Sequence, residues 1–344
     1  IGSFIIGKDQ PPFIVAEMSG NHNQSIEKAL EIVEKVAESG AHAIKLQTYT
    51  ADTLTIDKKD GDFYLGDKDS LWHGMSMYEL YQQAHTPWDW HKKIFDRCKE
   101  LGLLCFSSPF DETAVDFLET LNCPCYKIGS TENTDYELIK KVAETGKPVI
   151  ISTGMATIEE LGKITEVVKK AGCIELILLK CTAAYPASPA DANLLTIQHM
   201  KDMLDCQIGL SDHTLGMGVA VASVALGAVM VEKHFTISRK EGGVDSVFSM
   251  EPDEFSQMVI ETNIAWKAKG FICYGPIGSE NSNLSRRSLY IVKDINRGEK
   301  LTKQNIRSIR PGYGLAAKHI NTVLGMKATS DIKRGTRMSW DLVK

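Results

Sequence analysis

Eight short apolar segments recur along the first 240 residues, and nearly all of them end on polar residues. They are IVAEMSGNH (14–22), AIKLQT (43–48), LLCFSSPF (103–110), CYKIGS (125–130), VIISTGM (149–155), LILLKCTAAYP (176–186), QIGLSDHT (207–214) and VMVEKHFT (229–236). Helical patterns separate most of them, such as the apolar stripe that follows Ser25 and stops at Gly40. Eight strand–helix units predict an α/β fold, the (β/α)8 or TIM barrel, whose active site lies at the C-terminal strand ends.

The domain organisation follows from the length of the chain and from a repeat near its end. The 344 residues exceed the roughly 250 that a barrel needs. We predict the barrel over residues 1–270, a linker over 271–285 and a small domain over 286–344. Within that domain, KDINRGEKLTKQNI (293–306) and SDIKRGTRMSWDLV (330–343) share Asp-Ile-x-Arg-Gly at a spacing of 37 residues. The repeat predicts a pseudo-symmetric, β-rich unit.

One connection between predicted strands is unusually long. Thr48 and Leu103 are 55 residues apart, whereas most strand starts are separated by far fewer. The excess segment is rich in aspartate and aromatic residues. A long loop at the C-terminal end of a barrel strand is typically a lid or a substrate-binding loop, so we expect this insertion to help form the active site.

Composition excludes several classes of protein. A net charge of −5 without long Lys/Arg runs argues against nucleic-acid binding. No apolar stretch reaches the roughly 18 residues of a membrane helix, and the first residues lack the pattern of a secretory signal. The eight cysteines are scattered and form no Cys-x-x-Cys pair, which favours reduced thiols. We therefore expect a cytoplasmic protein without nucleic-acid or membrane partners.

Lysines and hydroxyl residues at the strand ends predict an anion site. Lys45 and Gln47 alternate with Ile44 and Leu46, so both should point to one side of their strand. Lys127 occupies a similar place on another strand. Ammonium groups inside a barrel are costly unless they meet an anion. We expect a small, highly charged ligand such as a phosphorylated carboxylic acid, surrounded by Ser107, Ser108, Ser130, Ser152, Thr153 and Ser211.

Two histidines predict a metal site. His213 and His234 each close a strand, and the two strands are consecutive along the chain. Adjacent strands lie about 5 Å apart, so both imidazoles could bind one divalent ion and leave positions for water and substrate. Mn²⁺, Mg²⁺ and Co²⁺ all suit such a donor set. Glu17, Asp245 and His22 are candidates for outer ligands or for proton transfer.

Taken together, these motifs are similar to those of a known family. AE-x-S-x-NH, KLQT, SSPF, YKIGS, STGM, GLSDHT and EKHFT, followed by the RPG turn in IRPGYG (309–314), resemble the sialic acid synthase family. In that family a (β/α)8 barrel precedes a small domain similar to type III antifreeze proteins, the SAF domain. The resemblance implies a metal-dependent condensation of phosphoenolpyruvate with a ring-opened amino sugar, without a Schiff base, to give a nine-carbon 2-keto acid.

Two segments look most like the pseudaminic acid synthases of this family. They are LWHGMSMYELYQQAHTPWDWH and AEMSGNHN. The sugar implied is 2,4-diacetamido-2,4,6-trideoxy-L-altrose, and the products are pseudaminic acid and phosphate. Where N-acetylneuraminate synthases have an asparagine after the Cys-Thr of strand six, this chain has Ala183, which removes a polar contact. This departure argues against the ordinary sialic acid substrate.

The resemblance also implies roles for individual residues. His213 and His234 match the metal ligands, and Arg310 matches an arginine that one subunit of a domain-swapped homodimer presents to the barrel of its partner. Sugar-side and acid/base positions match Glu17, Gln47, Tyr185 and Asp245, with Glu17 or Asp245 as the expected general base. Positions that contact phosphoenolpyruvate match Lys45, Ser108, Lys127, Ser130, Ser152 and Ser211.

Several other functions stay open at this point. N-acetylneuraminate or legionaminate synthesis would use a different sugar, and a 3-deoxy-keto-sugar-phosphate synthase would use a phosphorylated aldose. A Schiff-base aldolase would use Lys127 or Lys45 as its nucleophile. A binding module built on the antifreeze-like domain would have no catalytic activity. Assays with sugar panels, borohydride trapping with pyruvate and thermal hysteresis separate these possibilities.

Overall fold

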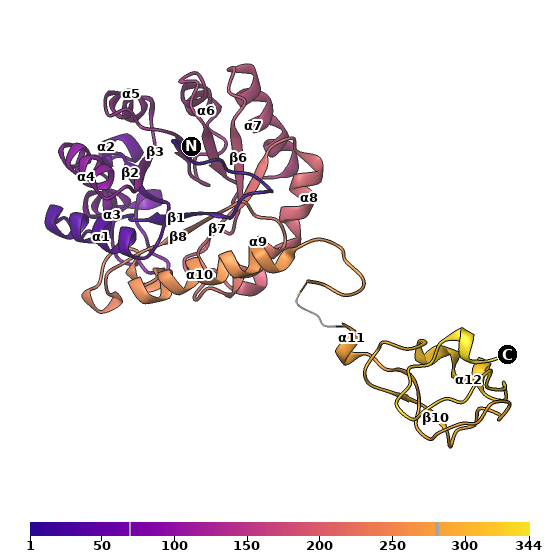
Figure 1. The fold of residues 1–344 in the computed structure, drawn as a ribbon. Coiled ribbons are helices and arrows are strands. Elements are labelled where there is room, and N and C mark those ends of the chain that lie inside the picture. The colour runs from indigo at the N-terminus through magenta and orange to yellow at the C-terminus, as the bar shows by residue number, and fades with distance from the viewer. Residues whose placement is uncertain (69, 279–281) are drawn as a thin grey trace. The chain divides into compact units, whose positions relative to one another are not determined.

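The chain forms two compact units, Ile1–Gly270 and Phe271–Lys344, as Figure 1 shows. The computed structural model describes residues 1–68, 70–278 and 282–344. Each unit has its own hydrophobic core, and each is described separately below. Within these described ranges, no helix combines the length and the apolar character that crossing a membrane would require.

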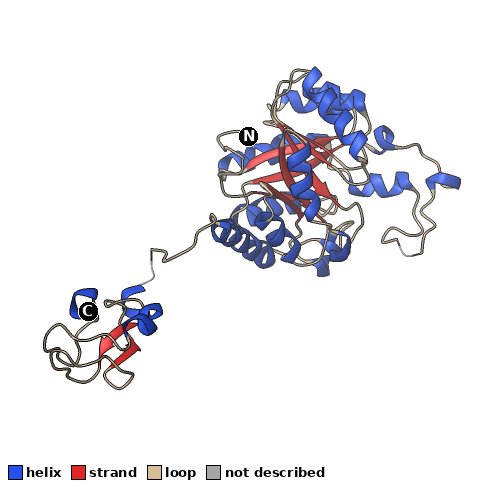
Figure 2. Ribbon diagram, turned by 90° about the vertical axis from the view of Figure 1, so that its right-hand side faces the viewer, coloured by secondary structure: helices blue, strands red, loops and turns tan. Residues whose placement is uncertain are grey.

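The first unit is a closed barrel of eight parallel strands in sequence order, with β8 hydrogen-bonded to β1. Figure 2 shows the strands enclosed by helices, so the predicted (β/α)8 fold is confirmed. Each strand lies within the apolar segment that predicted it, except that β1 begins one residue earlier, at Phe13. The strands are β1 (Phe13–Glu17), β2 (Ala43–Thr48), β3 (Leu104–Pro109), β4 (Tyr126–Ile128), β5 (Val149–Ser152), β6 (Leu176–Cys181), β7 (Gln207–Asp212) and β8 (Met230–His234).

Several helices begin at a side chain that caps the first turn and are followed by a glycine. Ser25 caps its helix by accepting a hydrogen bond from the backbone N–H of Lys28, and Thr157 forms a capping box with Glu160. Gly40 and the other terminal glycines adopt positive φ. The helices of this unit are α1 (Ile26–Glu38), α2 (Ala51–Leu54), α3 (Met77–Ala84), α4 (Trp88–Glu100), α5 (Glu112–Thr120), α6 (Tyr136–Ala143), α7 (Ile158–Lys170), α8 (Leu195–Met203), α9 (Gly218–Ala225) and α10 (Pro252–Lys269).

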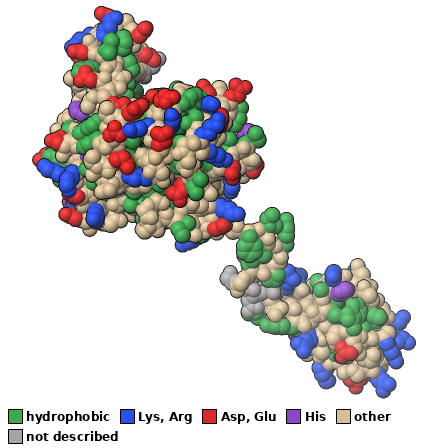
Figure 3. Space-filling view, turned by 90° about the horizontal axis from the view of Figure 1, so that it is seen from above, with side chains coloured by type: hydrophobic (Ala, Val, Ile, Leu, Met, Phe, Trp, Pro, Cys, Tyr) green, Lys and Arg blue, Asp and Glu red, His purple; other side chains and the backbone are tan. Residues whose placement is uncertain are grey.

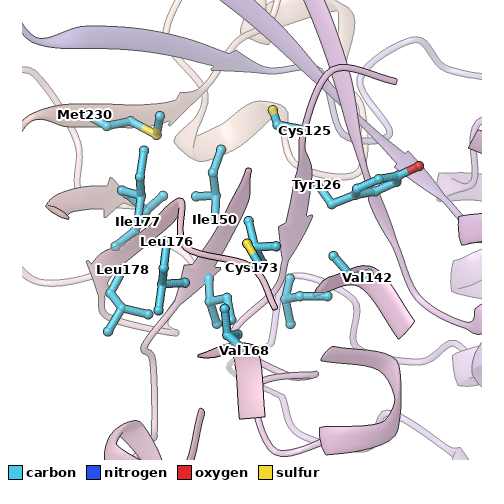
Figure 4. Close-up of a cluster of buried hydrophobic side chains, with 14 of the residues drawn as sticks. Cys125, Tyr126, Val142, Ile150, Val168, Cys173, Leu176, Ile177, Leu178 and Met230 are labelled. Carbon is cyan, nitrogen blue, oxygen red and sulfur yellow. The ribbon is translucent and has the colours of Figure 1, made fainter. Parts of the chain in front are cut away.

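Two clusters of buried apolar side chains form the core of the barrel unit. Figure 4 shows part of one cluster, in which strand residues such as Ile150, Ile177 and Met230 lie in a group with Val142 of α6 and Val168 of α7. Burying one such side chain stabilises the fold by about 1.5–3 kcal/mol. Ile150 and Met230 lie two residues before Ser152 and Glu232, so alternation along the strands places all four side chains on the face that carries the polar residues of the site.

The insertion after β2 is ordered around α2 and α3. A bridge pairs Tyr64 with Ser76 across its tip. The indole Nε1–H of Trp72 donates to the carbonyl oxygen of Val244 at 3.0 Å, which links the insertion to the loop after β8. The end of α3 also approaches the loop after β1 so closely that a Cβ on Gly20 would lie 3.0 Å from the Cα of Ala84. The insertion is therefore fixed against the mouth of the barrel.

The C-terminal unit contains a two-stranded antiparallel sheet of β9 (Ser288–Ile291) and β10 (Ile306–Ile309), with short helices α11 (Ser282–Ser285) and α12 (Ile320–Val323). The two sequence repeats meet at a bridge between Ile295 and Ile332. The aspartate of each repeat accepts a hydrogen bond from the backbone of the other repeat. Asp294 accepts from the backbone N–H of Arg334 at 2.8 Å, and Asp331 accepts from that of Arg297 at 2.7 Å. The two sequence repeats therefore form two segments that are joined by equivalent hydrogen bonds.

Candidate active site

A cavity of about 480 Å³ opens at the C-terminal ends of the barrel strands. Its size lies within the range of about 300–1,000 Å³ that is common for ligand sites. Most of the residues singled out in the sequence lie on its wall: Lys45, Gln47, Ser108, Lys127, Ser130, Ser152, Tyr185, Ser211, His213, His234 and Asp245. Arg310 lies in the C-terminal unit, on the turn that follows β10.

Lys45, Lys127 and Glu232 line the base of the cavity, and Glu17 is buried beside them. The ammonium of Lys45 contacts the carboxylate of Glu17, and it lies 3.7 Å from Oε1 of Glu232. The ammonium of Lys127 lies 2.9 Å from the same oxygen. All four side chains are buried. Glu17 and Glu232 therefore balance the charge of these lysines within the protein, a pairing that the sequence did not predict, and the anion site stays a prediction.

Glu232 is a site residue that the sequence analysis missed. Burial by itself would raise the pKa of its carboxyl, but Lys127 and Lys45 outweigh burial and lower that pKa to about 2. The carboxylate therefore stays ionised in the protein. Glu232 is two residues before His234 on β8, so the alternation of strand side chains already placed it on the same face as that histidine.

Small hydroxyl groups surround the base. Ser211 donates to Oε1 of Glu232 at 3.2 Å, and Ser108 lies 3.4 Å from the ammonium of Lys45. Ser130 accepts from the backbone N–H of Gly154 at 3.1 Å. The hydroxyl of Ser152 is buried and has no hydrogen-bond partner in the described part of the chain. Because buried polar groups are nearly always paired, an unpaired hydroxyl on a cavity wall indicates a ligand-binding position.

The two histidines of β7 and β8 meet on the cavity wall, with ring centroids 5.3 Å apart. Nδ1 of His213 lies 2.9 Å from the carbonyl oxygen of Thr182, which fixes the ring and leaves Nε2 as a possible ligand. Nδ1 of His234 is buried without a hydrogen-bond partner among the described residues, and it lies 3.9 Å from Asp245. Burial, reinforced by nearby positive charges, holds the pKa of His234 well below its ordinary value. That imidazole is neutral, as a metal ligand must be.

The donor set around these rings is incomplete for a closed metal site. Within residues 1–68, 70–278 and 282–344, no group of three or more His, Cys, Asp and Glu side chains has the geometry to hold a metal ion. Two imidazoles alone could hold an ion only if water or substrate oxygens supplied the remaining ligands. Such an open coordination sphere is the arrangement that metal-assisted catalysis requires.

Glu17 and Asp245 lie next to the cations and imidazoles and could take part in proton transfer. Glu17 accepts hydrogen bonds from the backbone N–H of Ser19 and from the Gln47 amide, both at 3.1 Å. The hydroxyl of Ser19 contacts the carboxylate of Asp245, and burial raises the pKa of Asp245. The ring of Tyr185 lies 4.4 Å from that of His213 between centroids. These groups can accept or deliver protons beside a ligand in the cavity.

His22 does not line the cavity, although the sequence made it a candidate for proton transfer. It is fully buried, where Nδ1 accepts from the backbone N–H of Gln24 at 3.2 Å and Nε2 lies 3.3 Å from the hydroxyl of Thr86. Burial lowers its pKa to about 4. The ring also packs edge-on against Trp90. In this place His22 holds the loop after β1 against the insertion.

The outer wall of the cavity is apolar and comes largely from the insertion. Its side chains include Leu54 of α2, Trp72, and a row on α3, while Tyr49 and Phe110 extend the surface. The sequence predicted that the insertion reaches the site, but not which of its side chains do so. Glu132, in the loop after β4, also lines the cavity, was not predicted, and has one carboxylate oxygen without a hydrogen-bond partner among the described residues.

Comparison with known proteins adds independent information. The chain is 41% identical over 334 residues to the pseudaminic acid synthase of Helicobacter pylori, covering 96% of this chain and 98% of that protein. It is 42% identical over 339 residues to the pseudaminic acid synthase of Campylobacter jejuni serotype O:2, covering 97% of each. The solved structure of an N-acetylneuraminic acid synthetase from Leptospira borgpetersenii, in complex with citrate, matches with a TM-score of 0.73 at 30% identity, covering 81% of this chain and 92% of that one.

The family models give the same assignment for both units. The model described as "SAF domain" matches residues 286–344, within the C-terminal unit. The model described as "NeuB family" matches residues 32–273, which span most of the barrel. With this match and relatives of more than 40% identity over nearly the whole chain, the protein belongs to the NeuB family.

Proposed function

We propose that the protein condenses phosphoenolpyruvate with ring-opened 2,4-diacetamido-2,4,6-trideoxy-L-altrose to give pseudaminic acid and phosphate. Similarity supports the choice of sugar, because the relatives at 41–42% identity are pseudaminic acid synthases, whereas the N-acetylneuraminic acid synthetase structure is 30% identical. One observation carries the chemistry: two lysines and several hydroxyl groups lie beside two imidazoles in a single cavity.

Phosphoenolpyruvate fits the base of the cavity. Its phosphate and carboxylate need cations and hydrogen-bond donors, and the base offers Lys45 and Lys127 together with nearby hydroxyls. Glu17 and Glu232 balance both lysines in the free protein, so the ligand must compete with preformed ion pairs. Charge-assisted hydrogen bonds of about 1.5–3 kcal/mol each would offset that competition. The hydroxyl groups we assign to this ligand are those of Ser108, Ser130, Ser152 and Ser211.

His213 and His234 would hold the divalent metal, which we propose to be Mn²⁺, Mg²⁺ or Co²⁺. When bound, such an ion polarises the aldehyde oxygen of the sugar as a Lewis acid. The neutral state of His234 and its unpaired Nδ1 fit this role. The hydrogen bond from His213 to the Thr182 carbonyl orients the second ring. Water and substrate oxygens would complete the coordination.

The bond changes follow from this arrangement. C3 of phosphoenolpyruvate attacks the aldehyde carbon, forming the new C–C bond and leaving positive charge at C2. Water adds to C2, and the C2–O bond to the phosphate then breaks, so that phosphate leaves. Either Glu17 or Asp245 takes the proton from the water, since both carboxylic acids lie beside the imidazoles and the lysines. Tyr185 and Gln47 would position the sugar from opposite sides.

We further propose that the active enzyme is a cytoplasmic, domain-swapped homodimer in which Arg310 completes the site of the partner. Residues 286–344 contain 14 of the 39 Lys and Arg but only 4 of the 44 Asp and Glu, and Figure 3 shows many of these cations on the C-terminal unit. The acidic remainder of the chain is electrostatically complementary to that unit. Phe271, Ile272 and Tyr274 are 83%, 90% and 95% exposed, which suits burial against a second copy.

Mass spectrometry of reaction products tests the proposal. The protein would be incubated with phosphoenolpyruvate and a panel of acetamido sugars, with and without a chelator. We expect pseudaminic acid from the L-altro sugar and no product once metal is removed. Preference for N-acetylmannosamine, for the legionaminate precursor or for a phosphorylated aldose would replace the proposed function with the corresponding synthase. A borohydride-trapped adduct with pyruvate would indicate a Schiff-base aldolase instead.

A further inference from the structure

The cavity is divided into a charged base and an apolar outer wall. The charged and hydroxyl groups come from the strands and their ends. The outer wall comes from the insertion, where Met77, Leu80, Tyr81 and Ala84 of α3 line the cavity with Leu54 of α2. The α3 residues have the spacing i, i+3, i+4 and i+7, which places them on one face of the helix. The face of α3 formed by these four residues therefore lines the cavity.

Three of these apolar side chains, those of Leu54, Met77 and Leu80, lie outside the hydrophobic core. The two hydrophobic clusters of the barrel unit, as far as the described residues define them, include neither Leu54 nor Met77 nor Leu80. Leu80 is nevertheless only 8% exposed. An amphipathic helix normally turns its apolar face to the core, whereas here that face meets a cavity. Such a surface gains stability when an apolar ligand group covers it.

The wall is held rigidly in place. Ser76 and Glu79 form a capping box at the start of α3. At its end, the Gln24 amide donates to the backbone carbonyl oxygens of Gln83 at 3.0 Å and His85 at 2.7 Å. The ring of Tyr81 packs edge-on against Tyr49. A surface fixed at both ends can discriminate between ligands by shape and polarity, because it does not rearrange to accommodate them.

We propose that Leu54, Met77 and Leu80 form a methyl-binding subsite that selects a 6-deoxy, 4-acetamido sugar. This inference rests on the proposed function and specifies how the site chooses its sugar. The aldehyde carbon reacts beside His213 and His234, so the end of the sugar that carries the C4 acetamido group and the C6 methyl extends toward the insertion. N-acetylmannosamine has hydroxyls at C4 and C6, and Leu54, Met77 and Leu80 offer no polar group to pair with hydroxyls placed against them.

Steady-state kinetics of two variants test the subsite. Met77→Gln keeps the length of the side chain but adds an amide, and Leu80→Ala removes apolar surface. For each variant we expect KM for the L-altro sugar to rise about tenfold, with KM for phosphoenolpyruvate unchanged. We also expect the ratio of kcat/KM values for the L-altro sugar over N-acetylmannosamine to fall about tenfold in Met77→Gln.

Matched controls lie on α8, away from the cavity. Met203→Gln and Leu195→Ala repeat the same substitutions at side chains that are 60% and 72% exposed. Both controls should have wild-type kinetics. Thermal unfolding of all four variants, with and without phosphoenolpyruvate, shows whether the base of the site is intact. A variant that binds phosphoenolpyruvate normally but loses affinity for the sugar supports the subsite.

The subsite and the proposed function fail in different ways. If Met77→Gln and Leu80→Ala keep the wild-type KM for the L-altro sugar and the wild-type preference over N-acetylmannosamine, the subsite is refuted while the function stands. If the wild-type protein does not convert the L-altro sugar, the proposed function is wrong. In that case Met77→Gln and Leu80→Ala would be assayed with the sugar that the wild-type protein does convert. If neither variant changes the KM for that sugar, the subsite is refuted as well.

Discussion

The two units of this chain differ in core, in charge and in the number of predicted site residues that they contain. The barrel unit has two large apolar clusters and a cavity in which nearly all of the predicted site residues already meet. The C-terminal unit has one cluster of ten buried residues, a marked excess of Lys and Arg, and a single predicted site residue, Arg310. The comparison shows that nearly all of the predicted site residues meet within one unit, whereas the excess of positive charge belongs to the other.

Removing one of the two imidazoles that we propose as metal ligands should have the largest effect, and it should separate activity from folding. We expect His234→Ala to lower kcat by about a thousandfold or more. The barrel should stay folded, because Nδ1 of His234 makes no hydrogen bond within the described chain. Turnover with saturating metal and thermal unfolding are the two measurements needed.

His22→Ala is the matched control for that variant. His22 is equally buried but hydrogen-bonds within the fold and does not line the cavity. We expect a loss of about 2 kcal/mol of stability, with kcat close to wild type at temperatures where the variant is folded. Substantial activity in metal-saturated His234→Ala would contradict the ligand assignment.

Breaking the charge balance at the base of the cavity should give the next largest effect. Glu232→Gln leaves Lys127 buried without its carboxylate partner, which typically costs about 3 kcal/mol of unfolding free energy. An anion in the cavity should replace the lost charge. We therefore expect phosphate or phosphoenolpyruvate to raise the Tm of Glu232→Gln more than that of the wild-type protein, as measured by thermal unfolding at several anion concentrations.

Ser211→Ala serves as the uncharged comparison, because Ser211 donates to the same carboxylate. It should cost about 1 kcal/mol and should leave the response to anions unchanged. If phosphate stabilises Glu232→Gln and the wild-type protein equally, the anion does not bind at the lysines whose charge Glu232 balances.

Much of the barrel could be predicted from the sequence because the signals are local. Strand alternation placed Lys45 and Lys127 inside the barrel, and two strand ends placed His213 beside His234. Glu232 could have been found by the same alternation. The wall formed by Met77 and its neighbours could not, because it depends on how a long insertion folds back over the strands, and helical periodicity does not say which surface an apolar face will meet.

Arg310 tests whether the C-terminal unit contributes to catalysis. Arg310→Ala should lower kcat/KM by about thirtyfold, since a hydrogen bond to a charged ligand is worth about 2 kcal/mol. Arg307→Ala, on the exposed side of β10, should leave kcat/KM unchanged. Mixing Arg310→Ala subunits with His234→Ala subunits should restore activity in mixed dimers, because one site then has both residues. Mixed dimers without activity would rule out a contribution from the partner.

The smallest effect should come from the repeat within the C-terminal unit. Asp294 and Asp331 accept equivalent backbone hydrogen bonds at 2.8 Å and 2.7 Å on opposite sides of the Ile295–Ile332 bridge. Each aspartate replaced by alanine should therefore lower the stability of this unit by about 1 kcal/mol, and the two losses should be similar. Asp294 also pairs with the exposed Lys333, but such surface pairs add little. Amide hydrogen exchange across both units measures the effect, and it should be confined to residues 286–344. A clearly unequal loss would mean that the two repeats share a sequence pattern without sharing a structural role.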